Sequence, residues 1–505
     1  MSKFIPRRLR RRTRLTVVGI TAGAVLAALI ALPANALSTA EAHTYLVLYK
    51  PGKSTSDATK VISSAGGTLV ANYAEIGVVI ARSDSTTFAT TVRGMSKVSG
   101  VAQTDRFGVQ IRDGELDSIE AGGPLPGNAP ATDNDTLSGL QWDMRQIHTP
   151  EAHAITGGSP SVVVGDIDTG LDFTHPDLAP NYDAANSTDC SSGAPQPLSV
   201  GNDRNGHGTH TAGTIAAAAN GTGIVGVAPN VKIAGIKSSN DDGFFFPEMV
   251  ICAYHWVATH GIDVTNNSYF ADPFLFNCKN DPEQRALWNA ERRAIGFAQS
   301  RGTVVVASEG NDSTDLSHPT VDVISPDFPP NAAVERSITN ACAVVPVEVP
   351  KVIGVTATGN RQLKSFYSSY GISTADVAAP GGDSILQVTP AAPNGRVLST
   401  FSSVGTICLP SRTVIENGAK YCYLQGTSMA APHAAGVAAL LLSKGVAPGG
   451  VQGAMQKSAN PLPCPDTSIY QPFPQNNGQP QVCTGGVPHN SFYGAGEIDA
   501  LKAVS

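Results

Sequence analysis

Apolar residues follow two different patterns along the chain, and the first marks a short unit near the N-terminus. Between residues 45 and 111, apolar runs of strand length alternate with segments of helical spacing. The glycines Gly66 and Gly67 stop the first helix. The predicted elements are strands at 45–49, 68–70, 76–80 and 101–111 and helices at 55–64 and 85–95. Their order, β-α-β-β-α-β, predicts a ferredoxin-like unit.

The second pattern runs from residue 139 to residue 505, where near-continuous apolar strands alternate with longer helices. Strands are predicted at 162–167, 231–236, 303–307 and 352–356, with another that starts at 263. Helices are predicted at 209–219, 247–260, 282–300 and 427–444. Strands that are apolar on both faces and separated by helices predict a parallel sheet with helices on both faces, which is an α/β fold.

The segment 112–138 between these two units has the composition of an exposed linker. Residues 112–120 are acidic, and residues 122–130 are dominated by proline and glycine. Such a composition disfavours a packed core and leaves the backbone accessible to proteases. We therefore expect a linker that holds a processing site.

The first 36 residues have the organisation of a secretory signal peptide. Seven basic residues and no acid precede residue 15, the uncharged stretch 15–32 follows, and Pro33 stands before the triplet Ala34-Asn35-Ala36. This pattern predicts signal cleavage and a secreted, extracellular protein without a membrane anchor. Two alternatives stay open: an uncleaved anchor, because an 18-residue stretch just suffices to span a bilayer, and twin-arginine instead of Sec export.

The charge of the chain argues against strongly negative partners. The formal net charge is −7, and leaving out the basic N-terminal segment leaves 27 basic against 41 acidic residues, a balance of −14. We therefore expect neither nucleic acid nor an anionic membrane among its partners. With 41% hydrophobic and 15% charged residues, the chain is neither disordered nor a coiled coil.

Eight cysteines, all after residue 189, fit an exported chain that folds under oxidising conditions. The absence of a C-x-x-C motif disfavours a zinc ribbon or a thioredoxin-like site. Cys190 and Cys252 either pair or stay free, and Cys252 lies in an apolar helix where a buried thiol is common. The other predicted pairs are Cys408–Cys422, Cys464–Cys483 and Cys278–Cys342.

The candidate chemistry lies just after predicted strands, because a parallel sheet binds ligands beyond the carboxyl ends of its strands. Asp168 ends the first long strand, in the sequence Asp168-Thr-Gly. Backbone donors at such a strand end can hold a carboxylate in place. Asp166 is the alternative in the same strand, but the D-T-G pattern favours Asp168. Taken alone, either residue is an ordinary turn aspartate.

His207 lies between two glycines at the start of a predicted helix. An imidazole is the usual general base near neutral pH. His210 creates an H-x-x-H spacing, but without an H-E-x-x-H motif this spacing does not predict zinc. We expect a catalytic role for His207 and a structural hydrogen bond for His210.

Ser428 begins the predicted helix 427–444, and Asn311 follows the strand 303–307. The free N–H groups at a helix N-terminus stabilise negative charge, including the anion that forms when a serine oxygen attacks a carbonyl. The amide of Asn311 can donate a hydrogen bond to the same anion. Taken alone, Ser428 is a helix cap and Asn311 a turn residue.

The motifs D-T-G, H-G-T-H, G-N and G-T-S-M-A-A-P-H, in this order, together resemble those of the subtilisin-like serine proteases, the subtilases. The order Asp168, His207, Ser428 is the subtilisin order and differs from that of the α/β-hydrolases. Four further segments also fit the family: 175–178, 223–229, 376–381 and 493–500. The resemblance covers about residues 140–505 and implies that the 45–111 unit is an inhibitory propeptide.

The resemblance implies a serine endopeptidase that hydrolyses peptide bonds through an acyl-enzyme on Ser428. His207 would act as base and then acid, Asp168 would orient the imidazole, and Asn311 would donate to the oxyanion. It also implies that substrate binds as an extended strand between two edge segments. The expected substrate-binding residues are Gly243, Phe244, Phe245, Ser268, Tyr269, Phe270, Ser308, Glu309 and Gly310.

Two of these residues depart from the family pattern. Phe270 stands where the family often has the glycine that keeps the S1 pocket open, so we expect a narrowed or reshaped pocket. Glu309 replaces a small residue beside Asn311, and either favours a basic substrate side chain or points to solvent, which is our expectation. Phe244, Phe245 and Phe246 make the groove more apolar unless some of them belong to the core.

The resemblance also implies a structural calcium site and no cofactor for catalysis. Hard oxygen donors suit Ca²⁺. The implied ligands are the side chains of Asp177 and Asn220, the carbonyls of Thr222 and Ile224, and the side chain of Gln141. The turn at Asn220 is equally compatible with an ordinary loop.

The expected partners are polypeptide substrates and the chain's own propeptide as an intramolecular inhibitor, and we expect a monomer. A processing protease of narrow specificity is the first alternative, motivated by Tyr269, Phe270 and Glu309. A secreted binding protein on an inactive protease fold is the second. The intact set of Asp168, His207 and Ser428 argues against it.

Overall fold

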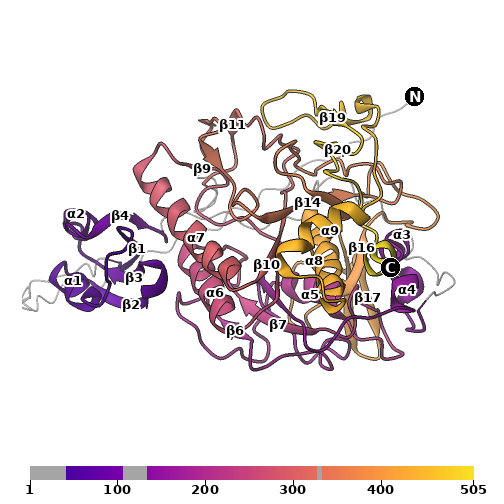
Figure 1. Ribbon diagram of the computed structural model, residues 1–505, viewed down its shortest axis with the longest axis horizontal. Coiled ribbons are helices and arrows are strands. Elements are labelled where there is room, and N and C mark those ends of the chain that lie inside the picture. The colour runs from indigo at the N-terminus through magenta and orange to yellow at the C-terminus, as the bar shows by residue number, and fades with distance from the viewer. Residues whose placement is uncertain (1–40, 106–132, 327–332) are drawn as a thin grey trace, which may run out of the picture. The chain divides into compact units, whose positions relative to one another are not determined.

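The structure, a computed structural model, describes residues 41–105, 133–326 and 333–505 (Figure 1). The predicted signal peptide, residues 1–36, and most of the predicted linker lie outside these residues. None of the helices in the described ranges combines the length and hydropathy that a bilayer crossing requires.

The N-terminal domain has the predicted ferredoxin-like order of elements. Its antiparallel sheet has the strand order β2-β3-β1-β4, and two helices connect the strands. The elements are β1 (His43–Tyr49), α1 (Ala58–Ser64), β2 (Thr68–Tyr73), β3 (Val78–Ser83), α2 (Phe88–Arg93) and β4 (Val98–Gln103). The last strand begins three residues earlier than predicted, and residues 106–111 of the prediction lie outside the described part of the chain.

The strands of this small sheet are apolar on both faces because both faces are covered. Tyr45 and Val47 pack with α1 and α2 in the domain's own core. Leu46 and Leu48, which point to the opposite face, belong to a core shared with the two helices α6 (Pro247–Thr259) and α7 (Pro282–Ser300). The continuous apolar run of β1 therefore serves two cores at once.

Polar contacts fix this docking of the N-terminal domain on the rest of the chain. The Tyr73 hydroxyl donates to the carbonyl of Gly193 at 2.5 Å, and the Arg293 guanidinium donates to the carbonyl of Tyr49 at 3.0 Å. The imidazole Nε2 of His255 lies 3.1 Å from a carboxylate oxygen of Glu75. We call the face formed by α6, α7 and the loop 190–196 the docking face.

A seven-stranded parallel sheet forms the centre of the larger domain, as predicted. Its strand order is β15-β14-β10-β8-β5-β7-β6, and every neighbouring pair is parallel. The strands are β5 (Val163–Asp168), β6 (Thr188–Asp189), β7 (Lys232–Lys237), β8 (Val264–Asn267), β10 (Val304–Ser308), β14 (Val352–Thr358) and β15 (Val377–Pro380). The carboxyl ends of β5, β8 and β10 therefore lie next to one another.

Helices cover both faces of this sheet (Figure 1). The helices α6 and α7 bury one face, and a second apolar core on the other face contains α5, α8 and the shorter helices. The helices of this second face are α3 (Trp142–Gln146), α4 (Thr149–His153), α5 (His207–Ala216), α8 (Thr427–Ser443), α9 (Val451–Ser458) and α10 (Ala500–Val504). The two layers leave the carboxyl edge of the sheet to the loops.

Smaller sheets elaborate the loops of the larger domain. A three-stranded antiparallel sheet contains β16 (Val397–Thr400), β17 (Thr413–Glu416) and β18 (Ala419–Leu424). The two-stranded pairs are β9 (Asn277–Cys278) with β13 (Cys342–Ala343), β11 (Val321–Asp322) with β12 (Arg336–Ser337), and β19 (Gly485–Gly486) with β20 (His489–Asn490). Their short length fits their role as loop anchors.

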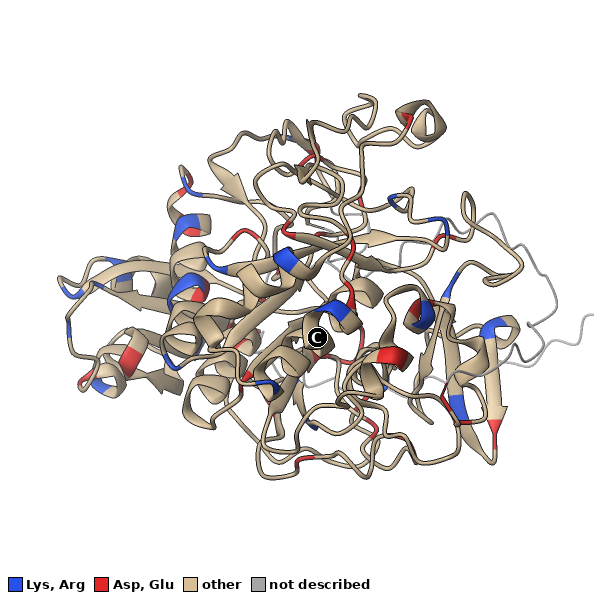
Figure 2. Cartoon of the chain, turned by 45° about the vertical axis from the view of Figure 1, so that its right-hand side comes forward, with Lys and Arg blue, Asp and Glu red and all other residues tan. Residues whose placement is uncertain are grey.

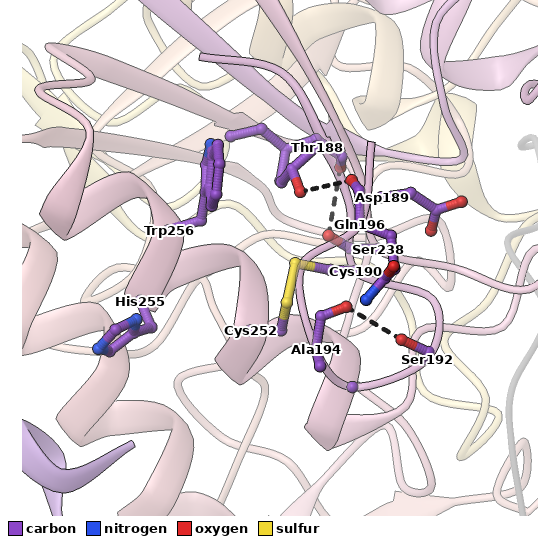
Figure 3. The surroundings of a disulfide bond; sticks show 12 residues. Thr188, Asp189, Cys190, Ser192, Ala194, Gln196, Ser238, Cys252, His255 and Trp256 are labelled. Carbon is purple, nitrogen blue, oxygen red and sulfur yellow. Dashed lines mark hydrogen bonds between the residues drawn. A yellow bond between two sulfur atoms is a disulfide. The ribbon is translucent and has the colours of Figure 1, made fainter. Parts of the chain in front are cut away.

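All eight cysteines form disulfides, and all three of the predicted pairs are present. Cys190 and Cys252, which the sequence left open, also pair. Figure 3 shows that this bond joins α6 to the loop that follows β6. A hydrogen bond from the Thr188 hydroxyl to the Gln196 carbonyl, 2.9 Å long, joins the two ends of the same loop. Within the docking face, the loop that accepts the hydrogen bond of Tyr73 is thus covalently tied to α6.

Positive and negative residues are interspersed along the described chain (Figure 2). The few ion pairs with short distances join different elements, for example Lys97 with Asp57 at 2.6 Å in the N-terminal domain. Exposed pairs of this kind contribute little to stability, so apolar burial and disulfides hold the fold.

Candidate active site

The carboxyl end of β5 brings an acid and an imidazole into contact. Asp168 is the last residue of β5, and His207 is the first residue of α5. The imidazole Nδ1 of His207 lies 2.7 Å from the Oδ1 atom of Asp168, and both side chains are fully buried. The same oxygen accepts the Thr169 N–H at 2.7 Å. The carboxylate therefore fixes both the tautomer and the orientation of the imidazole.

Asp166, the alternative to Asp168, and His210, which follows His207 in the H-x-x-H spacing, have other partners. Asp166 accepts hydrogen bonds from Thr211 and Asn266, and burial together with the nearby charge of Asp168 raises its pKa well above the usual value. His210 lies 3.0 Å from the carbonyl of Cys422, and burial lowers its pKa to about 3. The predicted structural role of His210 agrees with this geometry.

The loop before α5 is held by an acid that the sequence analysis missed. Asp203 accepts hydrogen bonds from the Thr169 hydroxyl, the Gly206 N–H and the Thr209 N–H, at 2.8–2.9 Å. It thereby ties the strand end that carries Asp168 to the helix that carries His207. The only signal in the sequence was its place four residues before His207, which by itself is typical of any helix start.

Glycine is required at the residue just before this helix. Gly206 has φ +101°, and a Cβ atom there would lie 2.2 Å from the ring of Phe401. The positive φ turns the backbone sharply into α5, and the missing side chain lets Phe401 pack against the turn. His207 is thereby placed at the strand edge.

Ser428 is the second residue of α8, and its hydroxyl donates to the carbonyl of Ser268 at 3.3 Å. The Ser268 hydroxyl in turn donates to the carbonyl of Ser428 at 2.9 Å. These bonds join the start of α8 to the end of β8. The helices α5 and α8 pack against each other, so the first turns with His207 and Ser428 belong to one layer.

Two N–H donors converge beside Ser428. The side-chain oxygen of Asn311 accepts the Thr427 N–H and the Thr427 hydroxyl, both at 2.9 Å, which leaves the NH₂ end turned the other way. A Cβ atom at Gly426 would lie 3.4 Å from that NH₂ nitrogen and 3.5 Å from the Ser428 backbone nitrogen. The glycine therefore keeps open the space between the two donors of the predicted oxyanion hole.

A pocket of about 600 Å³, open to solvent, adjoins these donors. Apolar side chains from separate loops, among them Phe270, Leu275 and Val344, form part of its wall. The predicted residues that line the pocket are Ser268, Tyr269, Phe270, Ser308, Glu309 and Gly310, together with Asn311 and Ser428. Sequence reasoning missed Leu275 and Val344 because they come from the loops that the Cys278–Cys342 disulfide joins.

The predicted second edge segment contributes less than expected. Gly243, Phe244 and Phe245 are not among the residues that line the pocket. Phe245 is fully buried and stacks on Tyr269 with ring centroids 4.3 Å apart. It is therefore a core residue, because the aromatic pair fills the space beneath the pocket.

The expectation that Glu309 points to solvent is wrong. Its side chain is buried, and its carboxyl accepts a hydrogen bond from the Thr374 hydroxyl at 3.1 Å. The physical reason is Gly354 on the neighbouring strand β14, which leaves room for the carboxyl group. The other expectation, recognition of a basic side chain, finds no support, because the carboxyl oxygens are turned toward β14.

The loop 220–224 gathers oxygen donors where the sequence predicted calcium. Asp177 accepts the Ile224 N–H at 3.0 Å, its second oxygen is buried without a partner among the described residues, and burial raises its pKa to about 7. Asp135, which was expected to lie in the linker, accepts the N–H groups of Asn220 and Gly221. These two carboxylates would suit a cation of the calcium type, which relieves buried negative charge.

The structure gives Gln141 a different role from the predicted one. Its side-chain oxygen accepts the Val225 N–H at 3.0 Å and its NH₂ donates to the Val225 carbonyl at 2.9 Å. Both ends of the amide are thus used by one residue of the backbone. Among the described residues no three His, Cys, Asp or Glu side chains form a metal-binding group. A cation here would therefore need Asn220 and backbone carbonyls in addition to the acids.

Comparison with known proteins identifies the relatives of the chain. A model of the subtilase family, Peptidase_S8, matches residues 159–485, which is more than half of the chain. A thermophilic serine proteinase of Bacillus sp. (strain AK1) is 30% identical over 324 residues, 63% of this chain and 61% of that protein. Fervidolysin of Fervidobacterium pennivorans is 31% identical over 332 residues, 63% of this chain and 40% of fervidolysin. The chain thus spans less than two thirds of the length of these two relatives.

A further relative and two solved structures agree with this assignment. Subtilisin DY of Bacillus licheniformis is 32% identical over 284 residues, 56% of this chain and 77% of that protein. The epidermin leader peptide processing serine protease of Staphylococcus aureus has a TM-score of 0.64 at 21% identity, over 92% of this chain and 98% of the other. Fervidolysin has a TM-score of 0.61 at 23% identity, over 92% and 61%. The two structures share the fold, and the chain belongs to the subtilase family.

Proposed function

We propose that the protein is a serine endopeptidase that cleaves polypeptides through an acyl-enzyme on Ser428. The observation that carries the proposal is the buried contact of His207 with Asp168, in a domain whose pocket is lined by Ser428 and Asn311. Membership of the subtilase family supports it. The contact of His207 with Asp168 argues against the alternative of a binding protein on an inactive protease fold, because binding alone does not require such a pair.

In the proposed reaction, the hydroxyl of Ser428 leaves its hydrogen bond with Ser268 by rotation about χ1 and gives its proton to Nε2 of His207. The serine oxygen then attacks the substrate carbonyl. Asp168, at Nδ1, stabilises the imidazolium that forms. His207 returns the proton to the leaving amine, and water hydrolyses the acyl-enzyme by the same steps in reverse order. Hydrogen bonds of this kind tighten when substrate binds.

The oxyanion of the tetrahedral intermediate would lie between the Asn311 amide and the Ser428 N–H. Thr427 fixes the amide through its oxygen, so the NH₂ group is already oriented before substrate arrives. Donors that need no reorganisation are the largest single source of rate enhancement in such sites.

We further propose that the pocket takes a large apolar side chain at the position before the scissile bond. Its wall is apolar at Phe270, Leu275 and Val344, and the carboxyl of Glu309 is turned away from it. A processing protease of narrow specificity remains the second candidate, because Phe270 stands where a glycine would leave the floor open. The two candidates differ in how many peptide sequences the enzyme accepts.

Two experiments test these proposals. A fluorophosphonate probe should label the full chain and fail to label the S428A variant, whereas equal labelling of both would refute the acyl-enzyme. A peptide library should then show cleavage after many sequences with Phe, Leu, Tyr or Met before the bond. Cleavage of a single extended motif would favour the processing protease instead.

The N-terminal domain is proposed to be an inhibitory propeptide of a secreted precursor. Its support is the apolar face that it shares with α6 and α7, and the sequence pattern of residues 1–36. Autoprocessing within the linker 112–138 would separate it from the catalytic domain. In the S428A variant, this cleavage should not occur, and the precursor mass should persist.

A structural calcium ion is proposed at the loop 220–224, held by Asp135, Asp177 and Asn220 together with backbone carbonyls. When bound, the ion would supply positive charge that links the segment before α3 to this loop. It has no part in the proposed proton transfers. The proposal replaces Gln141 by Asp135 as the side chain from the N-terminal segment of the catalytic domain.

A further inference from the structure

The residue before the oxyanion loop is an acid with an unusual environment. Glu309 extends the ladder of β10, since its N–H donates to the Val355 carbonyl of β14 at 3.1 Å. Its side chain lies against β14 at Gly354. In the parallel pairing of β10 with β14, Gly354 is the partner of Ala307. A Cβ atom at Gly354 would lie 2.6 Å from a carboxyl oxygen of Glu309. The glycine thus makes the space into which the carboxyl fits.

The hydrogen bonds of this carboxyl are too few for a buried carboxylate. One oxygen accepts the Thr374 hydroxyl, and the other is buried without a partner among the described residues. A carboxylate taken out of water needs several donors or a cation to stay ionised. With a single neutral donor, the protonated acid is the favoured form.

The charged groups around Glu309 reinforce this preference. Those with the largest effect on it are Glu348, Asp376 and Asp315, and all three are acids. Burial raises the pKa of Glu309 well above its usual value. The Thr374 hydrogen bond opposes this in part, and the negative neighbours add smaller upward shifts of the pKa. Geometry and electrostatics agree that Glu309 is a neutral acid at mildly acidic pH.

The position of Glu309 makes its protonation matter for the reaction. Only Gly310 separates it from Asn311, so the two Cα atoms are at most about 7.6 Å apart. The Gly310 N–H donates to the Thr427 hydroxyl, which also holds the oxygen of Asn311. A negative charge at Glu309 would oppose the negative charge that develops on the substrate oxygen beside Asn311.

We propose that Glu309 is a positioning residue of the oxyanion loop that works only as a neutral acid, so that its ionisation sets the upper pH limit of peptide hydrolysis. The inference rests on the proposed peptidase function. For two unit charges about 8 Å apart at an effective dielectric constant of about 20, the rate falls by about 30-fold on ionisation.

The test compares the pH profile of kcat/KM for the full chain, freed of its N-terminal domain by its own processing, between pH 5 and pH 10. The kcat/KM of the wild type should fall by about 30-fold on the alkaline side, while its circular dichroism stays unchanged. The E309Q variant keeps the shape and removes the titration, so it should retain its rate there. The acid side, where His207 takes up a proton, should be the same in both proteins.

A matched control is E291Q. Glu291 of α7 is likewise fully buried, with no partner among the described residues for either oxygen, and burial raises its pKa, but it does not line the pocket. E291Q should keep the alkaline fall of the wild type. An E309Q enzyme with that same fall, or a wild-type rate that is flat to pH 10, overturns the inference.

Two further outcomes separate the inference from the proposed function. Loss of fluorophosphonate labelling in the wild type at every pH would defeat the peptidase itself and not only the role of Glu309. If E309Q does not fold, the wild-type enzyme alone still tests the inference. Its alkaline fall should then appear equally in fluorophosphonate labelling and in peptide hydrolysis, whereas a fall confined to peptide hydrolysis contradicts an effect on the oxyanion.

Discussion

Two buried acids, Asp168 in the catalytic cleft and Glu248 under the N-terminal domain, are buried in different ways. Asp168 is covered by its own domain and receives the Thr169 N–H and the contact of His207. Glu248 lies in the first turn of α6, next to the docked domain, and one of its oxygens is buried without a partner among the described residues. Its hydrogen-bonding neighbour Thr104 belongs to the N-terminal domain.

The comparison teaches that a buried acid responds to a domain rearrangement only if that rearrangement exposes it. The surroundings of Asp168 persist as long as the catalytic domain is folded. Those of Glu248 last only while the N-terminal domain is docked, and burial there raises the pKa of Glu248 to about 7. Arg82 and Asp105, which shift the pKa of Glu248 in opposite directions, are also part of the N-terminal domain. Docking and proton uptake are therefore coupled at Glu248.

The largest expected effect comes from removing the charge of Asp168, which stays buried whether or not the N-terminal domain is docked. In D168N, the imidazole of His207 loses the partner that fixes its tautomer, and kcat should fall by about 10⁴-fold with the fold intact. Peptide hydrolysis by the processed variant, produced by processing in trans with wild-type enzyme, measures this loss. A D166N variant is the control, since Asp166 bonds Thr211 and Asn266, and a similar loss there would mean that the orienting acid has been misassigned.

The oxyanion donors should give the next largest effect. N311A removes one donor, and G426A places a methyl group between the two donors, so each should lower kcat by about 10²–10³-fold with a smaller change in KM. Steady-state kinetics on one fluorogenic peptide compares them. A G426A enzyme with unchanged kcat would show that the oxyanion forms elsewhere, because its Cβ atom would contact both donor nitrogens, those of the Asn311 amide and the Ser428 backbone.

The docking face should respond to pH by about 10²-fold. When the N-terminal domain undocks, the pKa of Glu248 returns from about 7 toward its usual value of 4.5. The docked state then holds more protons than the undocked one. Docking is therefore strongest below pH 4.5 and weakens as the pH rises to about 7, where the loss is complete. Hydrogen exchange of β1 and β4 amides in the full-length S428A chain measures the docking equilibrium.

E248Q is the variant that isolates this proton. It keeps the shape of the side chain without its titration, so the docking equilibrium of the S428A/E248Q chain should vary less between pH 4.5 and pH 7. A pH dependence that is unchanged in E248Q would assign the proton to another pair at the interface, of which Glu75 with His255 is the first to examine.

The smallest expected effect is on stability. If calcium binds at the loop 220–224, a chelator should lower the melting temperature of the processed enzyme by a few degrees, as expected for a ligand present at about 100 times its Kd. D135N should abolish the response to the chelator, whereas Q141A should retain it at a lower starting stability. A chelator response that survives in D135N would place the ion at another site.

Much of this arrangement could be predicted from the sequence because the relevant signals are local. Asp168 ends a strand and His207 opens a helix, and short motifs around them predicted their roles. The parallel sheet followed from strands that are apolar on both faces. The ferredoxin-like unit could be predicted because its helices and strands alternate within a short stretch, although the end of its last strand could not.

The features that sequence reasoning missed depend on contacts between distant segments. Asp135 lies in a stretch with the composition of a linker, and only the fold brings it to Asn220. Glu309 was assigned to solvent because nothing near it in sequence shows that Gly354 makes room on the next strand. Leu275 and Val344 reach the pocket through loops joined by a disulfide. Such residues are defined by partners tens to hundreds of positions away.

The disulfide between Cys190 and Cys252 also bears on the proposed release of the N-terminal domain. The crosslink spans 62 residues and restricts the loop that receives Tyr73, whether or not that domain is present. The receptor side of the contact is therefore preorganised, and a severed fragment can return to it without first ordering the loop. If the N-terminal domain is the proposed inhibitory propeptide, lasting activation would depend on destruction of the fragment as well as on the cut that releases it.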